Sequence, residues 1–127
     1  MSVQSYKDLV AWQKAMDLAE LVCQVTADYP RHEVYGLGSQ SRKAATSIPS
    51  NIAEGQGRRS TREFLHHLSI AHGSLCELET QILLGARLGY LREDQCGGVM
   101  SLGREVGRLV NGLYNSLAPE GEGRGRP

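Results

Sequence analysis

The segment GLGSQSRKAATSIPSNIAEGQGRRSTREF, residues Gly36–Phe64, decides the fold of this chain. Its apolar and small residues recur every three or four positions, which is the spacing along one face of an α-helix; they are Leu37, Ser41, Ala44, Ala45, Ile48, Ile52 and Gly55. Pro49 interrupts this pattern, because proline has no N–H to donate and its ring crowds the carbonyl four residues earlier. We therefore expect either one helix bent near Thr46–Pro49 or two short helices that meet there.

The residues before this segment also predict a helix. Ser5 and Asp8 resemble a capping box, and Pro30 ends the pattern because the residue before a proline avoids the helical region. The predicted buried stripe follows a spacing of three and four residues and consists of Leu9, Trp12, Met16, Ala19, Cys23 and Thr26. Three more residues widen this stripe, as a bundle helix requires, namely Val22, Val25 and Tyr29.

A third helix is predicted directly after the quoted segment. Ser60 and Glu63 form a capping box at its start, and Gly89 is placed to cap its end. Its apolar stripe consists of Phe64, Leu68, Ala71, Leu75, Leu78, Ile82 and Gly85.

A fourth helix is predicted over roughly Glu93–Leu117. Its apolar stripe consists of Val99, Leu102, Val106, Leu109, Leu113 and Leu117. The segment also contains several glycines, each of which costs about 0.5–1 kcal/mol in a helix relative to alanine, so we expect this helix to depend on packing. Gly103 and Gly107 lie four residues apart and would let another helix approach closely.

Four helices with short connections predict an all-α protein, an up-down-up-down antiparallel four-helix bundle. The 127 residues have the size of one domain and are enough for a core without disulfides or metals. We expect this domain to span residues 1–118. The remaining residues, 119–127, read PEGEGRGRP, contain no large apolar side chain and are expected to be disordered.

The composition favours a cytoplasmic protein without membrane spans. The chain has 14 Lys and Arg residues and 14 Asp and Glu residues, so its formal net charge is zero. Its three cysteines are an odd number at wide spacing, and the polar start Met1–Lys7 lacks the apolar run of a signal peptide. We expect reduced, partly buried thiols rather than a disulfide framework. No window approaches the length of uninterrupted apolar sequence that a transmembrane helix needs.

The sequence offers no catalytic constellation, and we expect no metal or cofactor. Di-iron bundles need two Glu-x-x-His pairs, whereas this chain has one, Glu63–His66, whose glutamate already caps a helix. His72 and Cys76 share a helix face and offer two zinc ligands, but structural zinc sites use four. His66 and His72 are therefore better interpreted as hydrogen-bonded or solvated side chains than as metal ligands. We therefore predict a protein that is not an enzyme.

Asn51 and Glu54, three residues apart beside Pro49, allow two interpretations. In the structural one, Asn51 hydrogen-bonds the carbonyls that the proline leaves free, and Glu54 pairs with Arg58 four residues later. In the functional one, both side chains are polar contacts between subunits. The structural interpretation is favoured.

A local excess of positive charge accompanies this helix. Residues 31–62 contain six basic and two acidic side chains, a local net charge of +4. Such charges are usually a solvated face, but arginines gathered at one end of a bundle can also bind phosphates. The candidate nucleic-acid-binding residues are Arg42, Lys43, Arg58, Arg59 and Arg62.

The small residues of the same helix suggest contacts between subunits. Together with surplus apolar residues on the first and third helices, they offer more apolar surface than one bundle buries. The candidate residues of this oligomer interface are Ala44, Ala45, Ser47, Asn51, Ala53 and Glu54.

Several stretches of the chain resemble one known family. They are YKDL at Tyr6–Leu9, WQKA at Trp12–Ala15, YGL at Tyr35–Leu37, RKAATSIPSNIAEG at Arg42–Gly55, AHGS at Ala71–Ser74 and ELET at Glu77–Thr80. The family is that of the four-helix bundle proteins first found encoded in intervening sequences of bacterial large-subunit ribosomal RNA genes. The similarity spans roughly Tyr6–Leu91, and its most specific part is Ser47–Gly55.

The resemblance implies a small cytosolic bundle that assembles into a ring, typically a homopentamer. Relatives include the accessory proteins of diversity-generating retroelements, which look like pentamers that bind nucleic acid and reverse transcriptase. Those relatives are strongly basic, whereas this chain is neutral. The family has no established enzymatic activity.

The favoured hypothesis is therefore a non-enzymatic, homo-oligomeric and by resemblance pentameric scaffold, whose partner is a protein or RNA. The alternative is an accessory protein that binds nucleic acid through the local arginine and lysine residues. A metal-dependent bundle enzyme is the third and weakest hypothesis.

Overall fold

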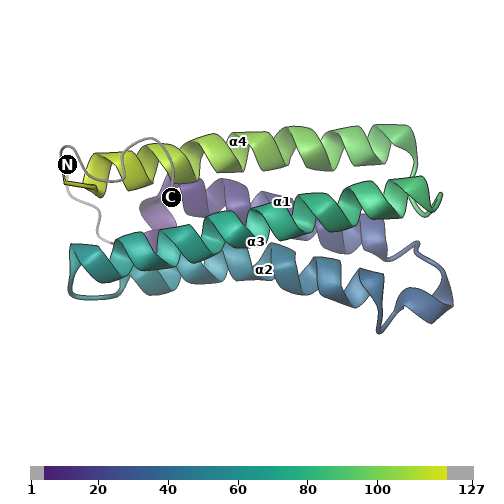
Figure 1. The fold of residues 1–127 in the computed structure, drawn as a ribbon, viewed down its shortest axis with the longest axis horizontal. Helices are drawn as coiled ribbons and strands as arrows, with labels where there is room; N and C mark the ends of the chain where they lie inside the picture. Colours follow the sequence, from purple (N-terminus) through teal and green to yellow (C-terminus); the bar gives the residue numbers. More distant parts are fainter. Residues whose placement is uncertain (1–4, 120–127) are drawn as a thin grey trace.

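Four α-helices make up almost all of the computed structural model, which describes residues 5–119. They are α1 (Val10–Thr26), α2 (Leu37–Gln56), α3 (Thr61–Arg87) and α4 (Glu93–Leu117). Two short 3-10 helices, η1 (Tyr6–Asp8) and η2 (Arg31–Glu33), precede α1 and α2. Consecutive helices run in opposite directions (Figure 1), which confirms the predicted all-α, up-down-up-down bundle. The predicted disordered tail lies outside the described residues except for Pro119.

Each helix packs on two neighbours, so the bundle has four sides. α1 contacts α2 and α4, and α3 contacts the same two helices from the opposite corner. The core between them is aliphatic, and its largest fully buried side chains include Leu18, Val22, Ile48, Ile52, Leu68, Leu78, Ile82, Val99, Val106 and Val110. Burying such side chains stabilises the fold by about 1.5–3 kcal/mol each.

The predicted stripe on α1 is confirmed at Ala19, Val22, Val25, Thr26 and Tyr29, and it is wrong at Met16 and Cys23. Met16 is 45% exposed and Cys23 is exposed, whereas Leu18 is fully buried. The buried line consists of Ala11, Ala15, Leu18, Val22 and Val25, with Ala19 and Thr26 at its border. Successive residues of an α-helix differ by about 100° in direction, so the two lines are adjacent faces. The small side chains of Ala11 and Ala15 let neighbouring helices pack closely on α1. The larger side chains of Met16 and Cys23 lie on the adjacent face.

Helix α2 continues unbroken from Leu37 to Gln56, so the alternative of two short helices is wrong. Pro49 lies inside it and is buried. The bend near Pro49 stays a prediction. Glu33 caps the start of α2, because its Oε1 atom accepts a hydrogen bond from the Leu37 N–H at 2.9 Å. The helix ends at Gln56, after which the chain turns.

The ends of α3 are capped as predicted. Ser60 Oγ accepts a hydrogen bond from the Glu63 N–H at 3.1 Å, and the two side chains also contact each other. At the other end Gly89 has a φ of 78°, a left-handed conformation that glycine adopts without strain. The Tyr90 N–H then donates to the Gly85 carbonyl at 2.9 Å, which is the closing bond of a Schellman motif.

The buried line on α4 also differs from the predicted stripe. It consists of Val99, Gly103, Val106 and Val110, while the predicted Leu102, Leu109, Leu113 and Leu117 are only half-buried. The close approach expected at the glycines explains the difference, because a Cβ on Gly107 would lie 3.2 Å from Leu75 Cδ2. The α4 backbone therefore packs near α3 along its glycine side.

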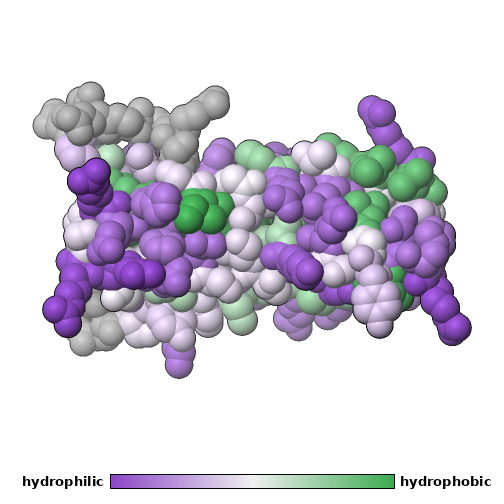
Figure 2. Space-filling view, turned by 60° about the horizontal axis from the view of Figure 1, so that its bottom comes forward, coloured by the Kyte–Doolittle hydropathy of each residue, from purple (hydrophilic) through white to green (hydrophobic). Residues whose placement is uncertain are grey.

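The surface is largely polar. In Figure 2 hydrophilic residues cover most of the visible face, and hydrophobic ones gather toward the end of the molecule where α3 ends. None of the helices in residues 5–119 combines the length and the hydropathy that crossing a membrane requires. All three cysteines are free, but Cys23 and Cys76 are exposed rather than partly buried.

A polar cluster joins the two loops at this end of the bundle. Glu33 caps α2 through Leu37, and its second carboxylate oxygen accepts a hydrogen bond from the Tyr90 hydroxyl at 2.8 Å. The Leu37 N–H first, and the Tyr90 hydroxyl second, lower the pKa of Glu33. The charged form of Glu33 thus ties the loop before α2 to the loop before α4.

This cluster predicts a dependence of stability on pH. Because the pKa of Glu33 is lower in the folded than in the unfolded chain, its contribution is present above the ordinary glutamate pKa of 4.5 and is lost as pH falls through the lowered pKa. We expect Glu33→Gln to lower the free energy of unfolding at pH 7 and to have a smaller effect at pH 3. Urea denaturation at a series of pH values measures this. A difference between the two chains that does not change with pH would contradict it.

Candidate functional site

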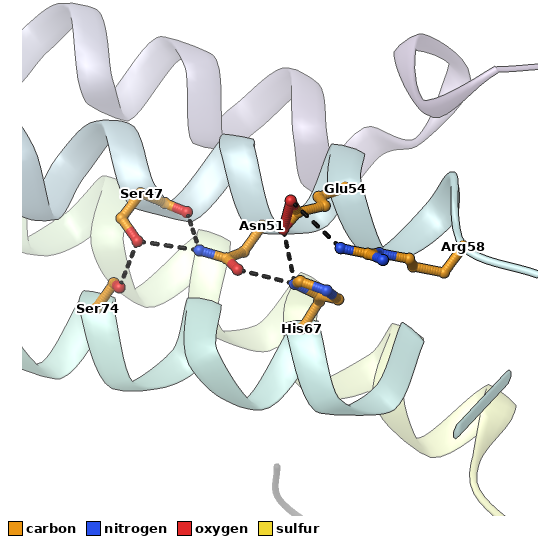
Figure 3. Close-up of polar contacts among 6 residues, drawn as sticks. All are labelled: Ser47, Asn51, Glu54, Arg58, His67 and Ser74. Carbon is orange, nitrogen blue, oxygen red and sulfur yellow. Dashed lines mark hydrogen bonds and ion pairs between the residues drawn. The ribbon is translucent and has the colours of Figure 1, made fainter. Parts of the chain in front are cut away.

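The most specific part of the sequence, Ser47–Gly55, forms a polar network between α2 and α3 (Figure 3). Asn51 is at its centre, where its side-chain N–H group donates to the Ser47 carbonyl at 2.9 Å and its amide oxygen lies 3.0 Å from His67 Nδ1. The Ser47 and Ser74 hydroxyls are 2.8 Å apart. Two helices are thus joined through side chains of both.

An ion-pair arm extends this network toward the end of α2. The Glu54 carboxylate lies 3.6 Å from Arg58 Nη2 and 3.3 Å from His67 Nδ1. The side chain of His67 is only 12% exposed, while those of Glu54 and Arg58 are about half exposed. His67 therefore contacts an amide oxygen and a carboxylate oxygen with the same nitrogen, which suits an Nδ1–H donor.

Gly55 lies at the closest approach of α2 and α3. A Cβ at this position would lie 2.7 Å from His67 Cβ and 2.9 Å from Phe64 Cδ1. Only glycine fits there without displacing the third helix. The SIPSNIAEG sequence is thus explained by the contact between α2 and α3: small and polar residues meet there.

These contacts support the structural interpretation of Asn51 and Glu54. Both side chains have partners within the subunit, and the predicted ion pair of Glu54 with Arg58 is confirmed. One detail is wrong. Pro49 leaves the Ala45 carbonyl free, because that carbonyl is four residues earlier, whereas Asn51 binds the Ser47 carbonyl and His67. No sequence pattern pointed to His67 as the partner of Asn51, because the spacing within α2 says nothing about a residue on α3.

Two of the six predicted oligomer-interface residues, Ala44 and Ala45, are buried in the bundle, and the other four are partly or fully exposed. Ala44 and Ala45 are 5% and 0% exposed, so the structure places both in the core rather than on the surface of the bundle. Ser47, Asn51 and Glu54 use their polar atoms in the network just described. Of the six predicted residues, Ala53 lines an open groove.

This groove runs between α1 and α2 and has a volume of about 570 Å³. Its apolar lining comes from the residues of α1 that the sequence analysis placed in the core, together with two residues of α2: Trp12, Met16, Ala19, Cys23, Pro49 and Ala53. Asp17 and Glu20 provide acidic groups at the α1 side. The folded subunit thus leaves an apolar groove open to solvent. We name it the α1–α2 groove.

The five predicted nucleic-acid-binding residues do not form one cluster. Arg42 is half-buried, and its guanidinium donates to the Val34 carbonyl at 3.1 Å and to Thr26 Oγ1 at 3.4 Å, so it holds the loop before α2. Lys43 is exposed beside it. Helical rise puts about 21 Å of α2 between Arg42 and Gln56, and Arg58 lies beyond that end. Arg42 and Lys43 therefore lie near the start of α2, apart from the three arginines that follow its end.

The other three arginines remain together at the α2–α3 connection. Arg58 and Arg62 line a hollow of about 550 Å³ with Glu63, His66 and His67, and Arg59 is exposed next to it in the chain. We name this the basic hollow. Its histidine pair packs edge to face, with ring centroids 5.7 Å apart.

Metal ligands do not gather in the part of the chain that the structure describes. No three His, Cys, Asp or Glu side chains within residues 5–119 are placed to hold a metal ion. Glu63 contacts Ser60 at the start of α3, and His72 Nε2 lies 3.7 Å from Cys76 Sγ.

Comparisons with known proteins agree with this architecture. A family model described as 23S rRNA-intervening sequence protein matches residues 7–112. The fold is similar to the crystal structure of a protein with unknown function from the S23 ribosomal protein family of Bacteroides thetaiotaomicron VPI-5482. That comparison gives a TM-score of 0.76 at 24% identity, covering 85% of this chain and 97% of that one. Comparison with curated proteins gives no match. Since the family model covers most of its length, the chain belongs to the 23S rRNA-intervening sequence protein family.

Proposed function

We propose that this protein is a non-enzymatic cytoplasmic scaffold that assembles with copies of itself through the α1–α2 groove. The observation that carries the proposal is the apolar lining of that groove, where Met16 is 45% exposed and Trp12, Pro49 and Ala53 lie alongside. Burial of a methionine or similar side chain contributes about 1.5–3 kcal/mol, so a few such residues stabilise a contact between subunits.

The same chain carries an apolar surface that suits this groove. Leu83 and Leu84 near the end of α3 and Leu88 at its C-cap are 48%, 47% and 51% exposed. Leu84 and Leu88 lie about one helical turn apart and Leu83 is adjacent to Leu84, so the three side chains form an apolar ridge at this end of α3. A groove on one surface and a ridge on another is the arrangement of a head-to-tail interface, which closes into a ring when the rotation allows. The family resemblance implies five subunits.

The mass of the assembly tests this function. We expect size-exclusion chromatography with light scattering, at micromolar protein concentration, to give a multiple of the 13.9-kDa chain mass. For a pentamer that multiple is five. Met16→Lys would place a charge in the groove and should shift the mass toward 13.9 kDa. Gln24→Lys, exposed on the same helix outside the groove, is the matched control and should leave the mass unchanged. A wild-type monomer, or a Met16→Lys assembly of wild-type mass, would contradict the proposal.

The basic hollow supports a second candidate function, binding of nucleic acid. Arg58 and Arg62 project into one hollow with two histidines, and a ring would repeat that positive group in every subunit. Phosphate contacts release counterions, so affinity should fall steeply with salt, and removal of each arginine should lower the salt slope by about one unit. Arg87→Gln, at the opposite end of α3, is the control. Absence of a gel shift at low salt would exclude this function.

A further inference from the structure

A third hollow lies between α3 and α4, on the side of the bundle opposite the α1–α2 groove. Its volume is about 380 Å³, which falls within the range of about 300–1,000 Å³ typical of small-molecule sites. The polar side chains that line it are those of His72, Glu79, Arg104, Arg108 and Asn111. We name it the α3–α4 hollow.

Two glycines form the wall of this hollow on α4. A Cβ on Gly107 would lie 3.2 Å from Leu75 Cδ2, and a Cβ on Gly103 would lie 3.6 Å from Glu79 Oε2. Side chains at these positions would therefore occupy space next to Leu75 and Glu79. The glycines of α4 weaken the helix but keep the hollow open toward the backbone.

Two polar atoms in the lining are buried and have no hydrogen-bond partner. They are His72 Nδ1 and Asn111 Oδ1. The other ring nitrogen of His72 faces Cys76 Sγ at 3.7 Å, so Nδ1 is the one left for another group. An amide oxygen can only accept a hydrogen bond, so Asn111 requires a donor such as a hydroxyl. Buried polar atoms of this kind are normally paired, which points to a polar occupant.

Two arginines supply positive charge at the same hollow. Arg104 and Arg108 lie one turn apart on α4 and share a face. Within residues 5–119 neither has an ion pair or hydrogen bond, so both guanidinium groups are available. Guanidinium groups bind phosphate oxygens in pairs of parallel hydrogen bonds. Glu79 is the carboxylate of the lining, so the charged groups of the hollow carry a net charge of +1 with His72 neutral.

We propose that the α3–α4 hollow binds a small hydroxylated phosphomonoester. Arg104 and Arg108 hold the phosphate, and Asn111 Oδ1 and the Glu79 carboxylate accept hydrogen bonds from the ligand hydroxyls. His72 Nδ1 makes a further hydrogen bond to the same molecule. The site lies away from both the α1–α2 groove and the basic hollow, so it is separate from self-association and from nucleic-acid binding.

Nuclear magnetic resonance with glycerol 3-phosphate as the probe tests this site. We expect saturable shifts of the His72 ring and of the Asn111 side-chain amide, because both line the hollow. The His32 ring, which contacts Tyr90, and the Gln13 side-chain amide, which donates to the Lys7 carbonyl, line neither hollow; they are internal controls and should not shift. Glycerol without phosphate should cause no saturable shift.

Variants distinguish this site from a general attraction of anions. The double variant Arg104→Gln with Arg108→Gln should bind glycerol 3-phosphate at least tenfold more weakly, and Arg59→Gln should bind it as the wild type does. Arg59, Arg104 and Arg108 are all exposed, and circular dichroism of each variant checks that the fold is kept. The proposal is overturned if His72 and Asn111 show no saturable shift at millimolar probe, or if the double variant binds with wild-type affinity.

Discussion

Leu18→Ala is expected to lower the free energy of unfolding by about 2–5 kcal/mol, the usual range for removing a buried leucine side chain from a core. Leu18 is fully buried at the centre of the line that α1 presents to the other helices. The loss comes from the interior of one subunit, so it should be the same at low and at high protein concentration. Urea denaturation at two protein concentrations measures it.

Gln24→Ala on the same helix is the control, because Gln24 is exposed and its substitution should change stability by no more than about 0.5 kcal/mol. Met16→Ala should behave differently from both. In a self-associated protein its cost should grow with protein concentration, because Met16 lines the α1–α2 groove rather than the core. If Leu18→Ala cost no more than Gln24→Ala, the placement of α1 would be wrong.

Gly55→Ala is expected to destabilise the protein by about 1–3 kcal/mol, the cost of forcing an extra group into a packed contact. The new Cβ would lie 2.7 Å from His67 Cβ and 2.9 Å from Phe64 Cδ1, so α2 and α3 would have to separate. The higher helix propensity of alanine offsets only about 0.5–1 kcal/mol of this cost. Thermal or urea denaturation gives the difference.

Gly73→Ala is the matched control within α3. No atom lies within 4 Å of a Cβ at this position, so the substitution should stabilise the protein by about 0.5–1 kcal/mol through helix propensity alone. The two substitutions make the same chemical change and should have opposite signs. A Gly55→Ala protein as stable as Gly73→Ala would show that α2 and α3 do not approach closely at Gly55.

The sequence predicted the helices and several of their ends well, because those features depend on neighbouring residues. The capping box of Ser60 with Glu63 and the left-handed Gly89 each involve only a few consecutive residues. The hydrophobic spacing then fixes the number of helices, and short loops fix their antiparallel order. The local pair of Glu54 with Arg58 was predictable for the same reason, since four residues make one helical turn.

Features that depend on the distance between helices were predicted less well. On α1 two adjacent lines of residues have the same spacing, and only the approach of the neighbouring helices decides that Leu18 rather than Met16 is buried. Asn51 finds His67 across the contact between α2 and α3, which no pattern within one helix reveals. Arg42 and Arg58 are close in the sequence but are separated by most of the length of α2.

The residues that were wrongly assigned to the core of α1 support the proposed function. Met16 and Cys23 follow helical spacing because they continue an apolar line with Trp12, which packs partly against the core, and that line faces the α1–α2 groove. The motif Ser47–Gly55, by contrast, joins α2 to α3 inside one subunit. Its small residues therefore fix the packing of α2 on α3, and the neighbouring α1 surface is free for the self-association that we propose.

The reactivity of Cys23 tests most directly whether the α1–α2 groove is covered by another copy of the chain. Cys23 is exposed in the single subunit and lines the groove, so its alkylation rate, followed by mass spectrometry of the peptide that contains it, reports on groove access. We predict that the rate falls as protein concentration rises from nanomolar to micromolar and that it stays constant in Met16→Lys. A wild-type rate that is independent of concentration up to the micromolar range would contradict the account.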